Sequence, residues 1–187
     1  MEELAGRIAF IKEAERLKNV LRSAHTSSGR QESTAEHTWR LCLMAVTFAD
    51  QLGAVDMARL LKLCVIHDLG EALHGDIPAT EQAGTPGKSE QERADLVELT
   101  RSLPPALQAE FLALWEDYEY AGSREARIVK ALDKLETLIQ HNQGLNPPGF
   151  DYAFNLSYGQ KHTAAEPLFA AIRAMVDEET RGRAAGG

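Results

Sequence analysis

The stretch LLKLCVIHDLGEALHGDIPA, residues 60–79, joins an apolar helix to a dense group of ionisable side chains. Residues 60–66 are too apolar for a surface helix, so we expect the pair His67-Asp68 to enter from the protein interior. Two further carboxylates and a second histidine follow before Pro78. Buried charge is costly unless it is paired, and a metal ion is an economical partner for His and Asp. The stretch therefore predicts a buried metal site.

The composition is that of an ordinary globular domain, with 44% hydrophobic and 26% charged residues among 187. We expect one domain over residues 1–187, with a frayed tail at 181–187. The net charge of −8 and the absence of any Lys or Arg run argue against a polymeric nucleic acid as partner, but they are compatible with a small anionic substrate. Without an apolar span or a signal-peptide pattern, we expect a cytoplasmic protein with no membrane partner.

Hydrophobic periodicity and capping residues predict helices almost throughout the chain. The expected helices span 2–21, 34–52, 56–73, 89–102 and 105–120, followed by one that begins at Ser123 and one that Thr163-x-x-Glu166 opens. Capping boxes at Ser33-x-x-Glu36 and Ser89-x-x-Glu92, a cap at Asp56 and the pair Pro104-Pro105 mark the starts of the second to fifth helices. The expected loops are a polar one at 23–32, a mobile one at 80–88 and a long irregular one at 144–162. Strand patterns do not exceed a few residues. The sequence thus predicts an all-α single domain of six or seven helices.

Two residues outside the central stretch complete a candidate ligand set. His37 falls in the first turn of the second expected helix, and Asp133 lies inside ALDKLET. On its own, a carboxylate at that position is more typical of a solvated helix face. Together with His67 and Asp68, however, these residues give two His and two Asp, a nitrogen and oxygen set suited to Mn, Co, Fe, Ni, Mg or Zn. Four protein ligands leave two positions on an octahedral ion, for a water and a substrate oxygen.

The pattern His37, His67-Asp68, Asp133 resembles that of the HD-domain metal-dependent phosphohydrolase superfamily. Within it, the surrounding segments resemble the HD-domain 5′-deoxynucleotidases, and the likeness covers residues 17–140. These segments are LKNVLR at 17–22, STAEHTWR at 33–40, VIHDLGEALHGDIPA at 65–79, LWEDYE at 114–119 and VKALDKLETLIQ at 129–140. The resemblance implies a single HD-domain helical bundle.

The resemblance also implies a reaction, the hydrolysis of (deoxy)nucleoside 5′-monophosphates to nucleoside and phosphate. It implies one divalent metal ion held by His37, His67, Asp68 and Asp133, catalytic roles for Glu71 and Asp76, and a phosphate contact by Arg22. One carboxylate would orient or deprotonate the water, and the other would contact the sugar or protonate the leaving 5′-oxygen. Glu36, which closes a capping box with Ser33, is a further candidate for substrate binding. A homodimer is expected because it is the commonest oligomer.

Other functions remain open on the sequence. A small HD-type (p)ppGpp hydrolase or other nucleotide pyrophosphohydrolase shares the ligands, as does a non-nucleotide phosphatase of the same superfamily. An HD oxygenase would need more His between Asp68 and Asp133, where only His74 occurs, so a mononuclear site is favoured. A non-enzymatic, metal-stabilised protein would leave Arg22 and Glu71 without a purpose. Several relatives have a Trp close after the Arg, whereas Ser-Ala-His follows here, which leaves sugar and base preference open.

Overall fold

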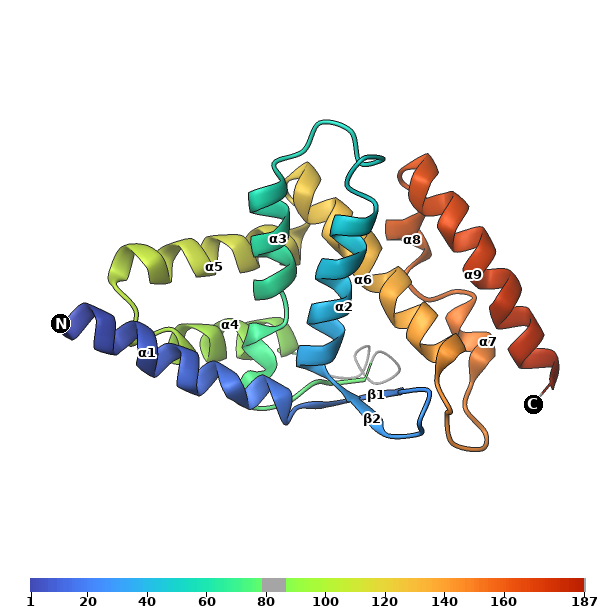
Figure 1. Cartoon of the computed structure of the whole chain (residues 1–187), viewed down its shortest axis with the longest axis horizontal. Helices are drawn as coiled ribbons and strands as arrows, with labels where there is room; N and C mark the ends of the chain where they lie inside the picture. Colours follow the sequence, from blue (N-terminus) through green and yellow to red (C-terminus); the bar gives the residue numbers. More distant parts are fainter. Residues whose placement is uncertain (79–86, 187) are drawn as a thin grey trace.

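The computed structural model describes residues 1–78 and 87–186, and it confirms the all-α prediction with the addition of one short hairpin (Figure 1). The elements are α1 (Glu2–Ala14), η1 (Glu15–Lys18), β1 (Leu21–His25), β2 (Gln31–Ser33), α2 (Thr34–Thr47), α3 (Met57–Ile66), η2 (Leu69–Ala72), α4 (Lys88–Leu99), α5 (Pro105–Tyr120), α6 (Arg124–Gln143), α7 (Tyr152–Asn155), α8 (Gln160–Thr163) and α9 (Pro167–Gly186). None of the described helices combines the length and apolar character of a membrane-spanning segment.

Helix α6 lies at the centre of the bundle and contacts α2, α3, α5, α8 and α9 (Figure 1). The helix begins where the Ser123 side chain accepts a hydrogen bond from the amide of Ala126. Most of its residues are buried, including Leu132, Leu135 and Leu138. Because neighbours surround this helix, a polar residue in its middle, such as Asp133, is placed in the interior instead of on a solvated face.

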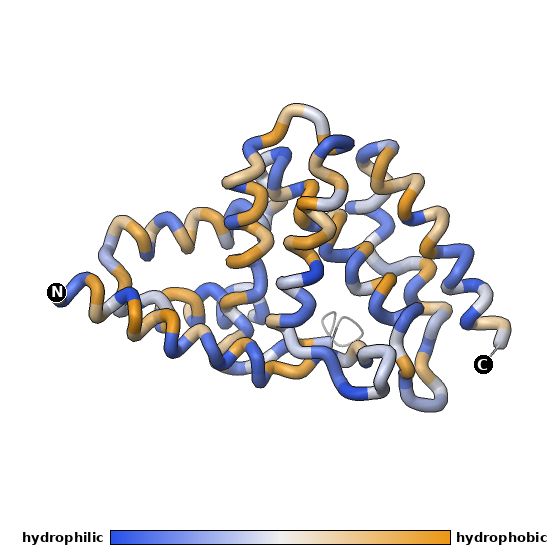
Figure 2. Tube along the Cα trace, viewed as in Figure 1, coloured by the Kyte–Doolittle hydropathy of each residue, from blue (hydrophilic) through white to orange (hydrophobic). Residues whose placement is uncertain are grey.

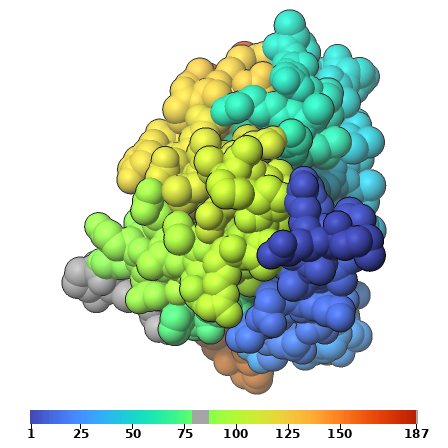
Figure 3. Space-filling model, turned by 90° about the vertical axis from the view of Figure 1, so that its left-hand side faces the viewer, coloured from blue at the N-terminus to red at the C-terminus, as the bar shows by residue number. Residues whose placement is uncertain are grey.

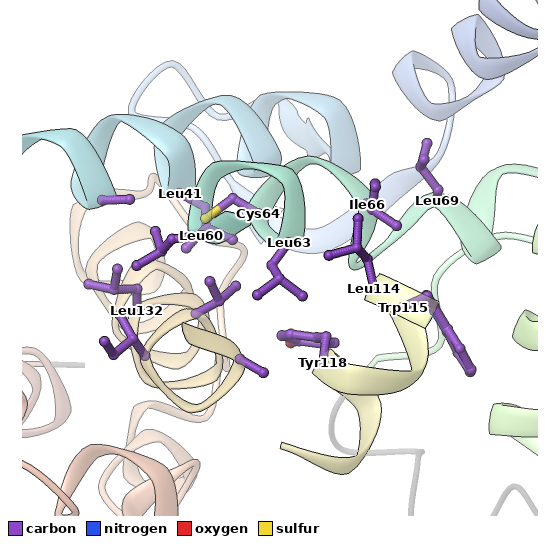
Figure 4. Packing of buried hydrophobic residues seen from close by; sticks show 14 of the residues in the cluster. Leu41, Leu60, Leu63, Cys64, Ile66, Leu69, Leu114, Trp115, Tyr118 and Leu132 are labelled. Carbon is purple, nitrogen blue, oxygen red and sulfur yellow. The ribbon is translucent and has the colours of Figure 1, made fainter. Parts of the chain in front are cut away.

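The apolar residues of α3 pack into this core, as the sequence predicts. Leu60, Leu63 and Cys64 lie with Leu132 of α6 and Tyr118 of α5 in one cluster (Figure 4). Leu63 is 0% exposed, whereas Val65 on the outer face is 50% exposed. The residues that follow α3, His67 and Asp68, therefore emerge from the core.

Helix α1 lies beside α4 and α5 at one end of the molecule (Figures 1 and 3). The ring of Phe10 meets the ring of Phe111 edge-on, with 5.4 Å between centroids, and the Ser102 hydroxyl donates a 3.0 Å hydrogen bond to the carbonyl oxygen of Gly6. Hydrophilic and hydrophobic residues are interspersed along α1, α5 and α9 (Figure 2). On α1, Phe10 is buried, whereas Leu4, Ile8 and Ile11 are exposed.

The first correction to the sequence-based expectations concerns residues 15–33. The helix expected over 2–21 ends at Ala14 and is followed by the short turn η1, and the polar loop expected at 23–32 is the antiparallel hairpin β1–β2. Leu21 pairs with Ser33 and His25 with Gln31. Gly29 closes the hairpin at φ +84°, a conformation that favours glycine, and its amide donates to the carbonyl of Thr26.

The second correction concerns the helix expected over 56–73, which ends at Ile66. Asp68 leaves the helical conformation, with φ −104° and ψ 8°, and the 3₁₀ turn η2 follows. The turn approaches α4 closely, because a Cβ built on Gly70 would lie 2.6 Å from the carbonyl oxygen of Glu92. His67 and Asp68 thus sit at a break between two elements and not on one continuous helix.

Capping predictions had mixed outcomes. The Ser33–Glu36 box, the Asp56 cap, the Pro105 start of α5 and the Ser123 cap are confirmed. The Ser89-x-x-Glu92 box is wrong, because α4 begins at Lys88 after Gly87 in the left-handed conformation. The Thr163-x-x-Glu166 box is also wrong, since Thr163 ends α8 and α9 begins at Pro167.

The expected loops also differ from the structure in part. The loop at 144–162 contains the short helices α7 and α8, and α9 continues to Gly186 through the tail that was expected to fray. The mobile loop at 80–88 lies outside the described residues apart from positions 87 and 88.

The close approach of η2 to α4 yields a stability prediction. We expect Gly70→Ala to lower the free energy of unfolding by about 1–3 kcal/mol, because the added methyl group would overlap the α4 backbone. Gly182→Ala is the matched control, since no described atom lies within 4 Å of a Cβ there. That change replaces a helical glycine and should raise the free energy of unfolding by about 0.4–1 kcal/mol. Urea denaturation measures both, and a Gly70→Ala protein as stable as the parent would contradict the close packing.

Candidate metal centre and active site

Four side chains from separate parts of the sequence meet at the centre of the molecule. His37 Nε2, from the first turn of α2, lies 3.2 Å from Asp133 Oδ1 of α6 and 3.8 Å from Asp68 Oδ2. His67 Nε2, at the end of α3, lies 3.0 Å from the same Asp68 oxygen. Ligand atoms of His37, His67 and Asp133 all fall within 4.8 Å of one another, a spacing that could hold a metal ion. The structure thus brings together all four predicted ligands.

Hydrogen bonds to the far sides of both rings turn Nε2 toward the cluster. His37 Nδ1 bonds to the Glu136 carboxylate, and His67 Nδ1 lies 2.8 Å from the carbonyl oxygen of Cys64. Among the described residues, His37 Nε2, His67 Nε2 and Asp68 Oδ2 are buried without a hydrogen-bond partner. Buried polar atoms are nearly always satisfied, so three that converge fit a site for a cation.

Asp133 is oriented by two donors. The buried Tyr118 hydroxyl donates a 2.6 Å hydrogen bond to Oδ2, and Lys134 Nζ lies 2.9 Å from the same oxygen. The other oxygen, Oδ1, is therefore the one that faces His37. Asp133 is 4% exposed, so the solvated interpretation of this carboxylate is wrong. Burial raises its pKa, but Lys134 and the two histidines outweigh that effect and hold the pKa well below the usual range.

Glu136 supports His37 and was missed in the sequence. It is 0% exposed and accepts a second hydrogen bond, 2.6 Å long, from Arg40 Nε. The spacing in the sequence could have identified Glu136, because it lies three residues after Asp133 and therefore shares one face of α6 with it. Glu32, His37 and Glu136 form a second close group of possible ligands. Arg22 and Arg40 already neutralise its two carboxylates, which points to ligand support and not to a second ion.

A cavity of about 620 Å³ opens onto the cluster and contains three more predicted residues, Arg22, Glu71 and Asp76. Glu71 is 5% exposed and accepts a 3.4 Å hydrogen bond from the Thr34 hydroxyl. Burial, followed by the charges of Asp68 and Asp76, raises the pKa of Glu71 well above its usual value. Burial also raises the pKa of Asp76, against the opposing charge of Arg22. Both groups therefore favour the protonated form more than an exposed carboxyl does.

Arg22 reaches this cavity because it lies on β1. Its Nη1 is 3.7 Å from Asp68 Oδ2, its Nε is 3.5 Å from Glu32, and Nη2 donates to the Thr137 hydroxyl at 3.1 Å. Glu32 is buried, and burial together with the nearby Glu136 raises its pKa to about 7. Sequence reasoning missed Glu32 and Thr137 because the hairpin that brings Arg22 to α6 was expected to be part helix and part loop.

Glu36 is a predicted site residue that neither lines the cavity nor belongs to the ligand cluster. Its carboxylate completes the capping box with Ser33 and pairs with both Nη atoms of Arg30 at 2.6 and 2.8 Å. These contacts hold the side chain on the outer side of α2, near Trp39. The capping role is thus the one that the structure shows for Glu36.

Comparison with known proteins agrees with this geometry. A protein-family model described as "HD domain" matches residues 14–173, and the chain belongs to this family. It is 33% identical over 185 residues to the 5′-deoxynucleotidase HDDC2 of Danio rerio, which covers 96% of this chain and 91% of that protein. It is 28% identical to the Dictyostelium discoideum protein of the same name, over 95% of this chain and 100% of that one.

A solved structure is also similar over nearly the whole chain. The crystal structure of a predicted metal-dependent phosphohydrolase from Magnetospirillum magnetotacticum matches with a TM-score of 0.84 and 32% identity, over 96% of this chain and 94% of that one. The resemblance to HD-domain 5′-deoxynucleotidases that the sequence suggested is therefore confirmed.

The bond between Glu136 and His37 yields a prediction for metal binding. Glu136→Gln keeps the size of the side chain but removes the charge that orients the ring, so we expect the affinity for Mn²⁺ to fall by about 10–100-fold. Glu178→Gln, on the exposed face of α9, is the control and should bind as the parent does. Calorimetric titration with Mn²⁺ measures both, and equal affinities would show that Glu136 does not support the centre.

Proposed function

We propose that this protein hydrolyses (deoxy)nucleoside 5′-monophosphates to the nucleoside and inorganic phosphate, using one divalent metal ion. The observation that carries the proposal is the convergence of three buried ligand atoms that lack a hydrogen-bond partner, beside a cavity lined by an arginine and two carboxyl groups. The printed names of the curated relatives, 5′-deoxynucleotidases, give the substrate class.

In this proposal His37, His67, Asp68 and Asp133 hold the ion, which supplies Lewis acidity and a water of lowered pKa. The donor set of two imidazoles and two carboxylates suits the divalent ions Mn, Co, Fe, Ni, Mg and Zn. Tyr118 and Glu136 keep Asp133 and His37 in place through the hydrogen bonds described above. A preoriented ligand set loses little entropy when it binds the ion.

Two carboxyl groups, Glu71 and Asp76, each carry out one of the two proton transfers. Glu71 lies deep in the cavity and accepts the proton of the attacking water, whose oxygen forms the new bond to phosphorus. The bond between phosphorus and the 5′-oxygen breaks, and Asp76 donates a proton to the leaving oxygen. Burial raises the pKa of both groups, so ionised Glu71 is a stronger base than an exposed carboxylate and Asp76 holds its proton more readily than an exposed carboxyl group. The net reaction consumes one water and returns both carboxyl groups to their starting states through solvent.

Arg22 binds the phosphate in this proposal. Its guanidinium borders the cavity next to Asp68, while Glu32 and Thr137 fix its orientation. A planar fork of N–H donors matches two phosphate oxygens at once. The small residues Ser23 and Ala24 also line the cavity beside it, so the adjoining wall leaves space for the sugar.

The homodimer expected from the sequence stays a prediction. The structure offers one surface that suits it: Trp39, Leu43 and Val46 are exposed and recur on one face of α2. Apolar side chains gathered in this way are typical of protein contacts.

Phosphate release from the purified protein tests the proposed activity. The panel contains Mn²⁺, Co²⁺, Mg²⁺ and Ni²⁺ with deoxyribonucleoside 5′-monophosphates, ribonucleoside 5′-monophosphates and (p)ppGpp. We expect Glu71→Gln to lower kcat by about 10²–10⁴-fold with little change in metal affinity. Glu119→Gln also alters a carboxylate of the cavity wall and should turn over nearly as the parent does. The proposal is lost if no 5′-monophosphate releases phosphate with any of the four metals.

A further inference from the structure

The cavity contains a cation that the assignments above leave without a direct role in the reaction. Lys134 borders the cavity immediately beside the ligand Asp133, with Nζ 2.9 Å from Oδ2. Arg22 borders it beside the ligand Asp68, with Nη1 3.7 Å from Oδ2. The two cations come from different elements, α6 and β1, and each touches a different carboxylate of the metal cluster. The two cations therefore lie on different sides of the part of the cavity that adjoins the ion site.

The position of Lys134 is fixed by packing. The segment before α8 rests on its aliphatic stem, because a Cβ built on Gly159 would lie 2.7 Å from Lys134 Cβ. Gly159 has φ +69°, so glycine suits this position on two grounds. The ammonium group lies 5.2 Å from the centre of the Tyr158 ring, and the side chain is only 20% exposed. Because its side chain is restricted by this packing, Lys134 keeps its ammonium group at a fixed position in the cavity.

Asp133 does not account for all the hydrogen-bonding capacity of Lys134. An ammonium group has three N–H donors, and the contact with Asp133 Oδ2 uses one. That oxygen already accepts a short hydrogen bond from Tyr118, so its satisfaction does not depend on Lys134. A second donor interacts with the Tyr158 hydroxyl, which leaves the third available to a ligand in the cavity.

Of the three other lysines that line the cavity, Lys161 is exposed, and Lys88 and Lys130 have carboxylates of their own. Lys88 bonds to Glu92, and Lys130 lies 3.7 Å from Glu119 and over the ring of Tyr118 at 4.2 Å. Among the described residues, the carboxylate in contact with Lys134 is the ligand Asp133, whose charge an ion would share. The charge of Lys134 is thus the one best placed to meet an anion at the centre.

We propose that Lys134 is a second phosphate-binding residue, which contacts the phosphate of the substrate together with Arg22. The proposal rests on the proposed function and extends it by one residue. A phosphomonoester carries up to two negative charges, and stabilisation of such charge by fixed cations is a large part of phosphoryl-transfer catalysis. Lys134 stays protonated throughout and moves no proton. It lowers the energy of the charge that develops on the phosphoryl oxygens.

Three variants test this assignment: Lys134→Gln, Lys134→Arg and, as the matched control, Lys130→Gln one helical turn away. Calorimetry gives the Mn²⁺ affinity of each and then the affinity of the Mn²⁺-loaded protein for inorganic phosphate. Turnover of a deoxyribonucleoside 5′-monophosphate gives kcat/KM. We expect Lys134→Gln to retain Mn²⁺ binding, to bind phosphate at least about tenfold more weakly and to lose about 10²-fold in kcat/KM. Lys134→Arg should restore part of both losses, and Lys130→Gln should bind phosphate nearly as the parent does.

Three results would overturn the assignment. Unchanged phosphate affinity in Lys134→Gln would show that the ammonium group does not contact the anion. A loss of Mn²⁺ affinity equal to the loss of phosphate affinity would make Lys134 a support of Asp133 alone. Equal effects of Lys130→Gln and Lys134→Gln would indicate a general charge effect. Phosphate binding is measured without turnover, so a parent protein that binds phosphate but hydrolyses no nucleotide would refute the proposed function and leave this assignment standing.

Discussion

The bond between His37 of α2 and Glu136 of α6 is the interaction on which the centre depends. Glu136 lies one turn beyond Asp133, so a single helix carries one candidate ligand and the group that orients another. Two carboxylates and a histidine in a bundle core would be costly if they were unpaired. Arg40 pairs with Glu136 and Lys134 pairs with Asp133, which offsets that cost. The packing of α2 on α6 therefore does more than fill the core, because it fixes the charges of the site against each other.

The sequence predicted the elements and side chains that local chemistry determines. A buried run before His67, a capping box at Ser33 and periodic apolar residues act within a few residues, so their outcome can be read from the chain. The features that the sequence did not predict depend on contacts between distant segments. Arg22 reaches α6 only because β1 pairs with β2, and Glu36 faces outward because its carboxylate serves the helix start and Arg30. No local pattern distinguishes these outcomes from the helix and the substrate contact that were expected.

The break after α3 shows the same limit at the centre itself. An unbroken helix would place Asp68 and Glu71 on one face, a turn apart. In the structure the chain leaves the helical conformation at Asp68, and η2 presses Gly70 against α4. The resulting geometry points Asp68 at the two histidines while Glu71 borders the cavity deeper in the protein. Tertiary packing, more than helical periodicity, separates the residue that could bind an ion from the residue that could act on water.

The candidate ligands come from positions 37, 67, 68 and 133, which lie far apart along the chain. An ion held by all of them would act as a cross-link between α2, the end of α3 and α6. A disulfide persists in the unfolded chain, whereas the ion would leave when the site comes apart, so its binding free energy would add to that of folding. The centre would then stabilise the fold as well as carry out the reaction. The free metal concentration would therefore change both the free energy of unfolding and the turnover rate of the protein.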